Sequence, residues 1–342
     1  MHVKRRLPAE WEPQDGVLLA WPHPQTDWAN NLAQITTVYC EIVQAISRFE
    51  KVVIIAPDIE QVQQTLREQE IDPSALTLVP LKTNDTWCRD FGPLTVYSDG
   101  KPLLLDFGFN GWGLKFAADY DNGVTRHLHE NGLLKGGLST PGLILEGGSI
   151  ESDGQGTLLT TSNCLLEENR NPHLSRPQLE QMLSEQFGAT LTLWLEHGYL
   201  AGDDTDSHID TLARLAPNDT ILYVRCDDKA DEHYPALQAM EQQLRTLRTR
   251  GGEPFNLCPL PWPRPAFDTE GNRLPATYAN FLVINNAVLV PTYADTADNK
   301  ALQTIGCAFP GREIIGIDCR ALIQQHGSLH CVTMQIPKGV LS

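Results

Sequence analysis

The sequence predicts an α/β fold in which residues 1–342 form one repetitive domain. Stretches with the apolar spacing of helices alternate about five times with short apolar, β-branched runs that are typical of buried strands. No Gly/Ser-rich linker or block of like charge divides the chain, and the Pro-rich segment at 259–267 is short enough to be a loop. A structural repeat with diverged sequence is therefore favoured over two independent domains, which the chain length alone would allow.

Five helices are predicted where apolar residues recur at i, i+3, i+4 and i+7 over part of a segment. These helices span residues 31–48, 116–131, 176–187, 231–249 and 296–308. A buried strand is predicted after each helix, at 51–57, 142–148, 191–196, 255–260 and 313–318. Further strand-like segments lie at 157–162 and 220–225, and residues 278–293 have the pattern of a hairpin.

The chain is strongly acidic, with a formal net charge of −17. Phosphates would be repelled, so neither nucleic acid nor an anionic membrane surface is expected as a partner, whereas small cations would be attracted. Solubility alone is the competing explanation of this charge. No apolar stretch approaches the ~20 residues that span a bilayer, and the charged N-terminal segment does not resemble a signal peptide. A cytoplasmic protein is expected, and a homodimer is possible.

Eight cysteines are present, and none belongs to a C-x-x-C pair. Neither a zinc ribbon nor a thioredoxin-like site is therefore indicated, and no metal or cofactor is expected. Most of the cysteines are expected to be reduced and to serve as small buried apolar residues. A nucleophilic cysteine must be identified by the residues around it.

Two acidic residues in the first half of the chain lie beside glycine-containing turns. Asp90 in NDTWCRDFGP (84–93) follows Trp87 and precedes a Gly-Pro turn, and the competing interpretation is a structural ion pair of Arg89 and Asp90. Glu146 in LEGGS (145–149) ends a predicted strand, and the two glycines allow backbone or ligand to approach closely. A plain strand-to-turn junction is the alternative.

The densest polar cluster is GDDTDSHIDT at 202–211. His208 and Asp210 are two residues apart, so on a strand they would face the same side. An EF-hand loop is excluded because the frames that begin at Asp204 and Asp206 lack the required glycine and glutamate. A solvated acidic loop remains an alternative, but His208 borders the apolar run HIDTLARL, and buried charge requires a partner.

Two later segments complete the candidate set. Asn280 lies at the start of the strand predicted in TYANFLVINN (277–286). Cys331 lies in a predicted strand within HGSLHCVTMQIPKG (326–339), after a turn at Gly327 and Ser328. By itself, Cys331 could equally be a buried core cysteine.

A thiol, an imidazole and several carboxylates together suit chemistry on a guanidinium group. Carboxylates grip this planar cation bidentately, a thiolate can add to its central carbon, and an imidazole can protonate the departing ammonia and then activate water. Cysteine-protease chemistry fits less well, because a ring of carboxylates opposes thiolate formation. The residues that supply the set are Asp90, Glu146, His208, Asp210 and Cys331.

Motifs along nearly the whole chain resemble the agmatine deiminases, within the wider bacterial peptidylarginine-deiminase-like group of guanidine-modifying enzymes. The motifs are PAEWEPQDGVLLAWPH, NDTWCRDFGP, FNGWGLKF, LEGGSIESDGQGT, GDDTDSHID, YANFLVINNAVLVPTY and SLHCVTMQIPKG. The resemblance implies a five-bladed, pseudo-symmetric α/β propeller of ββαβ-type modules around a central acidic site. It also implies hydrolysis of agmatine to N-carbamoylputrescine and ammonia through a covalent cysteine amidino-thioether.

The same resemblance assigns roles residue by residue. Cys331 becomes the nucleophile and His208 the general acid and base, while Asp90 and Asp210 grip the guanidinium. The substrate-binding wall would consist of Glu146, Trp87 and Asn280.

The chain departs from the family pattern at three places. His326–Cys331 keeps the His-Cys pair of the usual Gly-Gly-Gly-Asn-Ile-His-Cys run but loses two glycines and the Asn. Glu151 stands where many members have His, and Asp206-Ser207 replaces the usual Asn-Gly. Two alternatives therefore stay open: deimination of free or peptidyl arginine, and a catalytically degenerate protein that binds cations or polyamines.

Overall fold

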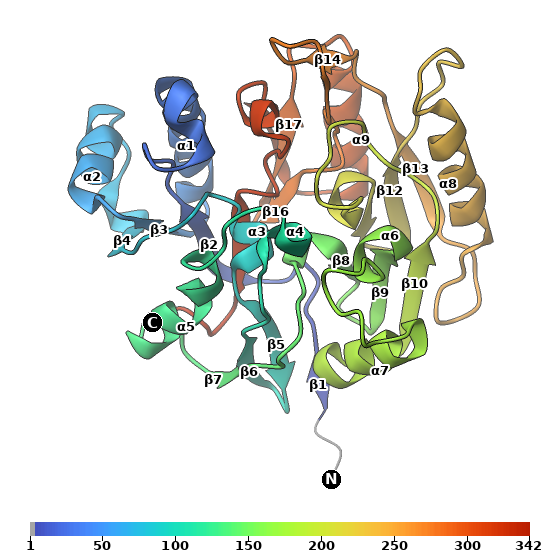
Figure 1. The fold of residues 1–342 in the computed structure, drawn as a ribbon, viewed down its shortest axis with the longest axis horizontal. Coiled ribbons are helices and arrows are strands. Elements are labelled where there is room, and N and C mark those ends of the chain that lie inside the picture. Colours follow the sequence, from blue (N-terminus) through green and yellow to red (C-terminus); the bar gives the residue numbers. More distant parts are fainter. Residues whose placement is uncertain (1–3) are drawn as a thin grey trace.

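The computed structural model describes residues 4–342 and has an α/β fold, as predicted (Figure 1). The first three residues of the expected domain lie outside the described part. Five sheets have three or four strands each, and a sixth is the two-stranded pair of β14 (Ala266–Phe267) and β15 (Arg273–Leu274). The longer helices lie toward the periphery of the view in Figure 1, whereas the short elements α3 (Cys88–Phe91) and α4 (Gly111–Leu114) lie near its middle.

The five larger sheets share one connectivity. In each, an antiparallel pair of strands is followed, after a helix, by a strand parallel to the second. Four sheets take their strands in chain order: β5 (Leu94–Ser98), β6 (Lys101–Leu105) and β7 (Gly137–Ser139); β8 (Ile150–Ser152), β9 (Thr157–Thr161) and β10 (Leu191–Leu195); β11 (Ala213–Ala216), β12 (Thr220–Val224) and β13 (Asn256–Leu260); β16 (Leu282–Ile284), β17 (Ala287–Thr292) and β18 (Glu313–Asp318).

The fifth sheet joins the two ends of the chain. Its strand β19 (Thr333–Pro337) pairs antiparallel with β2 (Gln14–Ala20), which continues in parallel to β3 (Lys51–Ala56) and β4 (Leu76–Pro80). The short β1 (Arg5–Arg6) adds to β5. The connecting helices are α1 (Leu32–Ser47), α2 (Ile59–Glu68), α5 (Val124–Glu130), α7 (Arg176–Phe187), α8 (Tyr234–Thr246) and α9 (Asp298–Ala308), and α6 (Ser162–Leu165) is a single turn.

Local sequence explains why the best predicted elements begin and end where they do. Helix α7 starts with a reciprocal capping box between Ser175 and Gln178 and ends at Gly188, whose φ of 72° favours glycine. The apolar runs of β3 and β12 are buried on both faces, as parallel strands covered by helices require. The predictions for α7 and β18 are confirmed at both ends.

The structure differs from the predicted elements at several places. Residues 142–148 form no strand: Ile144 makes only a single parallel bridge to Gly108, and the chain then turns at η4 (Gly147–Ser149). A Cβ at Gly147 would clash with the Arg89 carbonyl, so the backbone here is built for close approach. Within 116–131 only α5 is a regular helix, and α2 was not predicted.

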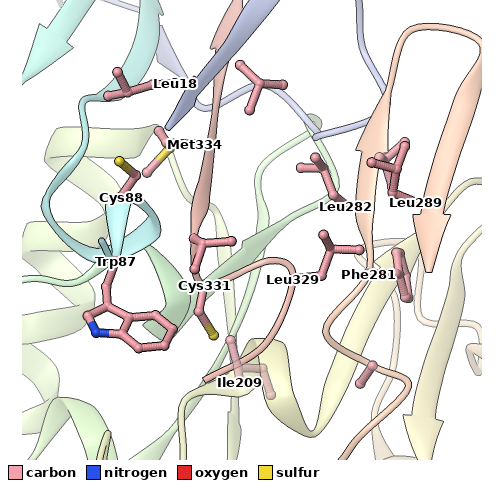
Figure 2. Close-up of a cluster of buried hydrophobic side chains, with 14 of the residues drawn as sticks. Leu18, Trp87, Cys88, Ile209, Phe281, Leu282, Leu289, Leu329, Cys331 and Met334 are labelled. Carbon is pink, nitrogen blue, oxygen red and sulfur yellow. The ribbon is translucent and has the colours of Figure 1, made fainter. Parts of the chain in front are cut away.

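The apolar core extends up to a group of polar residues at the ends of the sheets. Figure 2 shows the Trp87 ring and the Cys331 sulfur next to each other, at the edge of a buried cluster that includes Leu329 and Met334. Within residues 4–342, no helix combines the length and apolar character that crossing a membrane requires.

Candidate active site

A cavity of about 430 Å³ opens beside this cluster. Of the seven predicted site residues, Trp87, Asp90 and Cys331 line it directly. Carboxylates are frequent in its wall, and none of the described residues that line it is a lysine or an arginine. Four of the lining carboxylates, here called the front carboxylates, are Asp85, Asp90, Asp121 and Asp204.

Asp90 is held by donors on both of its oxygens. Its Oδ1 accepts a hydrogen bond from the Gly148 N–H at 3.0 Å, and its Oδ2 accepts one from the Trp112 Nε1–H at 2.9 Å. The anticipated ion pair with Arg89 does not form, since the Arg89 guanidinium faces Glu10 instead, with 3.8 Å between Nη2 and Oε2. Burial and the Asp210 carboxylate raise the pKa of Asp90, against the opposing effect of His208.

His208 and Asp210 meet Asp90 around a glycine. A Cβ at Gly148 would lie 2.6 Å from His208 Nδ1, 2.9 Å from Asp90 Oδ1 and 3.2 Å from Asp210 Oδ2, so a side chain here would push these groups apart. The two residues do not lie on a strand, the case in which the sequence would have placed them on one side. Instead they belong to the 3-10 turn η5 (Ile209–Thr211). His208 comes directly before this turn and Asp210 lies in it, and the turn brings the two side chains together.

Two polar atoms in this group are buried without a hydrogen-bond partner in the described chain: His208 Nε2 and Asp210 Oδ1. An unpaired buried polar group typically costs about 1–3 kcal/mol, so such atoms usually await a ligand or water. The other Asp210 oxygen accepts a hydrogen bond from His330 Nδ1 at 2.7 Å, which leaves Oδ1 as the free acceptor.

Glu146 lies behind His208 and does not line the cavity. Its Oε2 is 3.8 Å from His208 Nε2, and both of its oxygens accept from Arg170 Nε, at 3.0 and 2.8 Å. The sequence had suggested an acidic wall residue, but in the structure this carboxylate is paired by a buried arginine. Burial acts to lower the pKa of His208, but the Asp90 carboxylate and other neighbours outweigh it and raise the pKa well above the ordinary value.

Asn280 also lies behind the cavity, before β16 rather than in it. Its Oδ1 accepts from the His330 and Cys331 N–H groups at 2.8 and 3.3 Å and contacts the Cys331 thiol at 3.4 Å. It therefore shapes the turn that presents the sulfur, instead of lining the pocket as the sequence had suggested.

Cys331 lies in that turn, two residues before β19, so its prediction as a strand residue was wrong. The turn is fixed from the other side by the Arg89 N–H, which donates to the Cys331 carbonyl at 3.1 Å. Burial, Asp210 and Asp90 together raise the pKa of the thiol well above its ordinary value. These effects favour the protonated thiol over the thiolate.

Beneath the site lies a buried set of charges, here called the rear network, made of Glu10, Arg89, Glu151, Arg214 and His330. Glu10 Oε2 lies 2.7 Å from His330 Nε2 and 3.0 Å from Arg214 Nη2, and Arg214 Nε contacts Glu151. Burial acts to raise the pKa of Glu10, but His330 and Arg214 outweigh it and lower the pKa. The rear network holds Asp210 through His330.

Sequence reasoning missed several of these residues. The signal for Arg214 was a charged residue inside the apolar run HIDTLARL, and the signal for Trp112 was the motif FNGWGLKF. Two groups of side chains lie close enough together to hold a metal ion, Glu146 with Cys164 and His208, and Glu10 with Glu151 and His330. In each group an arginine already pairs a carboxylate, so a metal would meet a fixed positive charge.

The front carboxylates differ from the rear network because no described arginine or lysine side chain forms an ion pair with them, although His208 lies 3.6 Å from Asp90. Burial raises the pKa of Asp85 to about 7 and that of Asp121 to about 8, and it also raises the pKa of Asp204. Near neutral pH Asp85 and Asp121 are therefore partly protonated, and a nearby cation would favour their ionised forms. This arrangement suits a small organic cation.

Comparison with known proteins agrees with this site. The model of the Porphyromonas-type peptidyl-arginine deiminase family matches residues 6–337. A Shewanella baltica protein named "Putative agmatine deiminase" is 35% identical, over 97% of this chain and 94% of that one.

Two solved structures are also similar to this chain. One, named "Putative Arginine Deiminase" from Porphyromonas gingivalis, is 50% identical with a TM-score of 0.94, covering 99% of this chain and 100% of that one. A C. jejuni agmatine deiminase with substrate bound is 42% identical with a TM-score of 0.91, covering 98% and 97%. With the family match over nearly its whole length, this chain belongs to the Porphyromonas-type peptidyl-arginine deiminase family.

Proposed function

We propose that the protein hydrolyses agmatine to N-carbamoylputrescine and ammonia. The observation that carries this proposal is a cavity in which a thiol faces several carboxylates and which no described lysine or arginine lines. The free Oδ1 of Asp210 and the carboxylate of Asp90 are suited to receive the N–H groups of one planar guanidinium.

Binding of the substrate cation would convert the Cys331 thiol into the nucleophilic thiolate. A positive charge between Asp90 and Asp210 offsets the carboxylates that hold the proton on Cys331, so substrate binding lowers the pKa of the thiol. The thiol gives its proton to solvent water, and the thiolate then adds to the central guanidino carbon. The nearby imidazolium of His208 gives its proton to the departing nitrogen, ammonia leaves, and an amidino-thioether remains on Cys331.

Water completes the reaction at the same carbon. Neutral His208 takes a proton from water as it adds to the amidino-thioether, and the tetrahedral adduct expels the thiolate and leaves the ureido product. Glu146 would serve this step by holding His208, since its carboxylate is paired with Arg170. The imidazole thus acts first as an acid and then as a base.

The charge of the cavity favours agmatine over arginine. Asp85 and Asp204 line the same cavity and suit the second positive charge of agmatine. The α-carboxylate of arginine would meet these acids and no lysine or arginine among the described lining residues. Arginine is the second candidate substrate, because the 50%-identical relative is named an arginine deiminase.

We infer also that the five sheets surround the site as the blades of a propeller. The inference is supported by the position of each site residue just before the first strand of a different sheet. Asp90 precedes β5, Glu146 precedes β8, Asp210 precedes β11, Asn280 precedes β16 and Cys331 precedes β19.

The test is an assay of the purified protein with agmatine and with arginine, with the ureido product measured for each. We expect kcat/KM to be at least about tenfold higher for agmatine, because only arginine brings a carboxylate into an acidic cavity. Mass spectrometry of acid-quenched reactions should find the added amidino group on the Cys331 peptide. Full activity of a Cys331→Ser variant, or tight agmatine binding without turnover, would reject the proposal.

A further inference from the structure

A left-handed turn stands beside Asp90. The four residues of α4, Gly111 to Leu114, have φ angles of 67°, 54°, 81° and 68°. Such a run is unfavourable for residues with a side chain, here Trp112 and Leu114, because the Cβ crowds the following carbonyl. Strain of this kind persists only where the surroundings enforce it, and it gathers at functional sites.

Contacts on both sides enforce the turn. Asn110 Oδ1 accepts from the Gly113 N–H at 2.9 Å, while Asn110 Nδ2 donates to the Asn169 carbonyl at 2.8 Å. A Cβ at Gly111 would clash with the Phe116 carbonyl, so only glycine fits there. The turn closes with the Lys115 N–H donating to the Gly111 carbonyl at 3.0 Å.

The turn delivers one side chain to the site. The Trp112 indole lines the cavity and donates to Asp90 Oδ2, while the ring edges of Phe109 and Phe116 meet it at nearly right angles, with centroids 5.0 and 5.5 Å away. Gly148 donates to the other Asp90 oxygen. Two donors on two oxygens fix the plane of the carboxylate.

We propose that Trp112 is a positioning residue that holds the Asp90 carboxylate in line for the guanidinium. The proposal rests on the proposed function of the site. An indole suits this role because it donates one hydrogen bond and carries no charge. A lysine or arginine in its place would neutralise Asp90 and compete with the substrate cation.

Several titratable groups face Asp90, from three parts of the chain: His208, Asp210, Glu146 and Cys331. His208 favours the ionised carboxylate, and the acidic groups oppose it. The Trp112 hydrogen bond also favours the ionised form. Loss of this donor should therefore raise the pKa of Asp90 and move the acid limb of the pH–rate profile to higher pH.

The test is Trp112→Phe, which keeps an aromatic wall and removes the N–H. We expect kcat/KM for agmatine to fall about tenfold to a hundredfold, the usual effect of losing a hydrogen bond to a charged group, and the acid limb to shift upward. The matched control is Trp194→Phe. Trp194 also donates from its indole to a carboxylate, Glu180, at 2.8 Å, but it does not line the cavity. The kcat/KM and the pH–rate profile of Trp194→Phe should match those of the wild type.

Unchanged kcat/KM and an unshifted acid limb in Trp112→Phe would overturn the proposal. If the Phe variant does not fold, replacement of the Trp112 indole by benzothiophene removes the donor with little change in shape, and the same two outcomes apply. If the wild type forms no product from agmatine, the proposed function fails by itself. Calorimetry with agmatine then tests the inference, with binding at least about tenfold weaker in the variant as the expected result.

Discussion

The front carboxylates and the two glutamates of the rear network, Glu10 and Glu151, differ in the side chains that pair them, since in the described chain only the glutamates contact arginine. In front, burial raises the pKa of Asp85, Asp90, Asp121 and Asp204. In the rear network, His330 and Arg214 outweigh burial and lower the pKa of Glu10, whereas burial still raises the pKa of Glu151 against the opposing effect of Arg214. Arginine side chains pair the carboxylates of the rear network, whereas none of the described residues that line the cavity is an arginine or a lysine, which suits the proposed binding of a cation there.

Asp210 connects the two regions. One oxygen accepts from His330, a member of the rear network, and the other is buried without a partner. Burial acts to raise its pKa, but the His330 hydrogen bond outweighs it and lowers the pKa. Asp210 is therefore held as an ionised acceptor before any substrate arrives.

The largest effect is expected in front, from Asp90→Asn. One guanidinium-binding charge is lost, so kcat/KM should fall by about 10³-fold or more. The folding free energy should change by less than about 2 kcal/mol, because relief of the repulsion between Asp90 and Asp210 partly offsets the weaker hydrogen bonds from Gly148 and Trp112. Product assays and urea unfolding measure the two quantities. If Asp90→Asn lowered the free energy of unfolding by as much as it lowered the free energy of transition-state binding, the front carboxylates would not differ from the rear network in their role.

In the rear network, Arg214→Met should act mainly on folding. It leaves Glu10 and Glu151 without their shared partner, and breaking a buried ion pair typically costs about 3–5 kcal/mol. The matched control is Arg320→Met, which removes the exposed pair with Asp318 and should cost less than about 1 kcal/mol. Urea unfolding compares them. Equal costs would mean that the rear network is not a support.

The pH dependence of stability should sharpen the comparison. The pKa of Asp85 is raised from 3.8 to about 7, so the folded state holds its proton more tightly than the unfolded state. Its contribution to stability is therefore lost as pH rises between these two values. Asp85→Asn removes this loss and should be more stable than the wild type above pH 7, with the difference vanishing near pH 4. Thermal unfolding at several pH values checks this, and a constant difference would contradict it.

The smallest effect is expected at Ser207, in the loop that leads to His208. Its φ is 65°, at a place where the family pattern has glycine, so Ser207→Gly should raise stability by up to about 1 kcal/mol. The control Ser184→Gly, within α7, should instead lower stability by about 0.5–1 kcal/mol. Chemical denaturation measures both. A destabilised Ser207→Gly would show that the serine side chain matters more than backbone strain.

The sequence by itself determined the fold class, many of the elements and the family. Elements such as α7 and β18 could be predicted because caps, glycines and apolar periodicity act within a few residues. The irregular backbone at 142–148, where a strand was expected, could not be predicted from the sequence. Gly147 packs closely against the Arg89 carbonyl, and Arg89 is distant in sequence.

Only the tertiary structure decided which site residues face the cavity and which support them. Glu146 and Asn280 were expected in the wall but lie behind His208 and Cys331, where Arg170 and backbone N–H groups satisfy them. The physical reason is that a carboxylate or amide acts through its nearest partners. Those partners come from segments far apart in the chain, which no local pattern records.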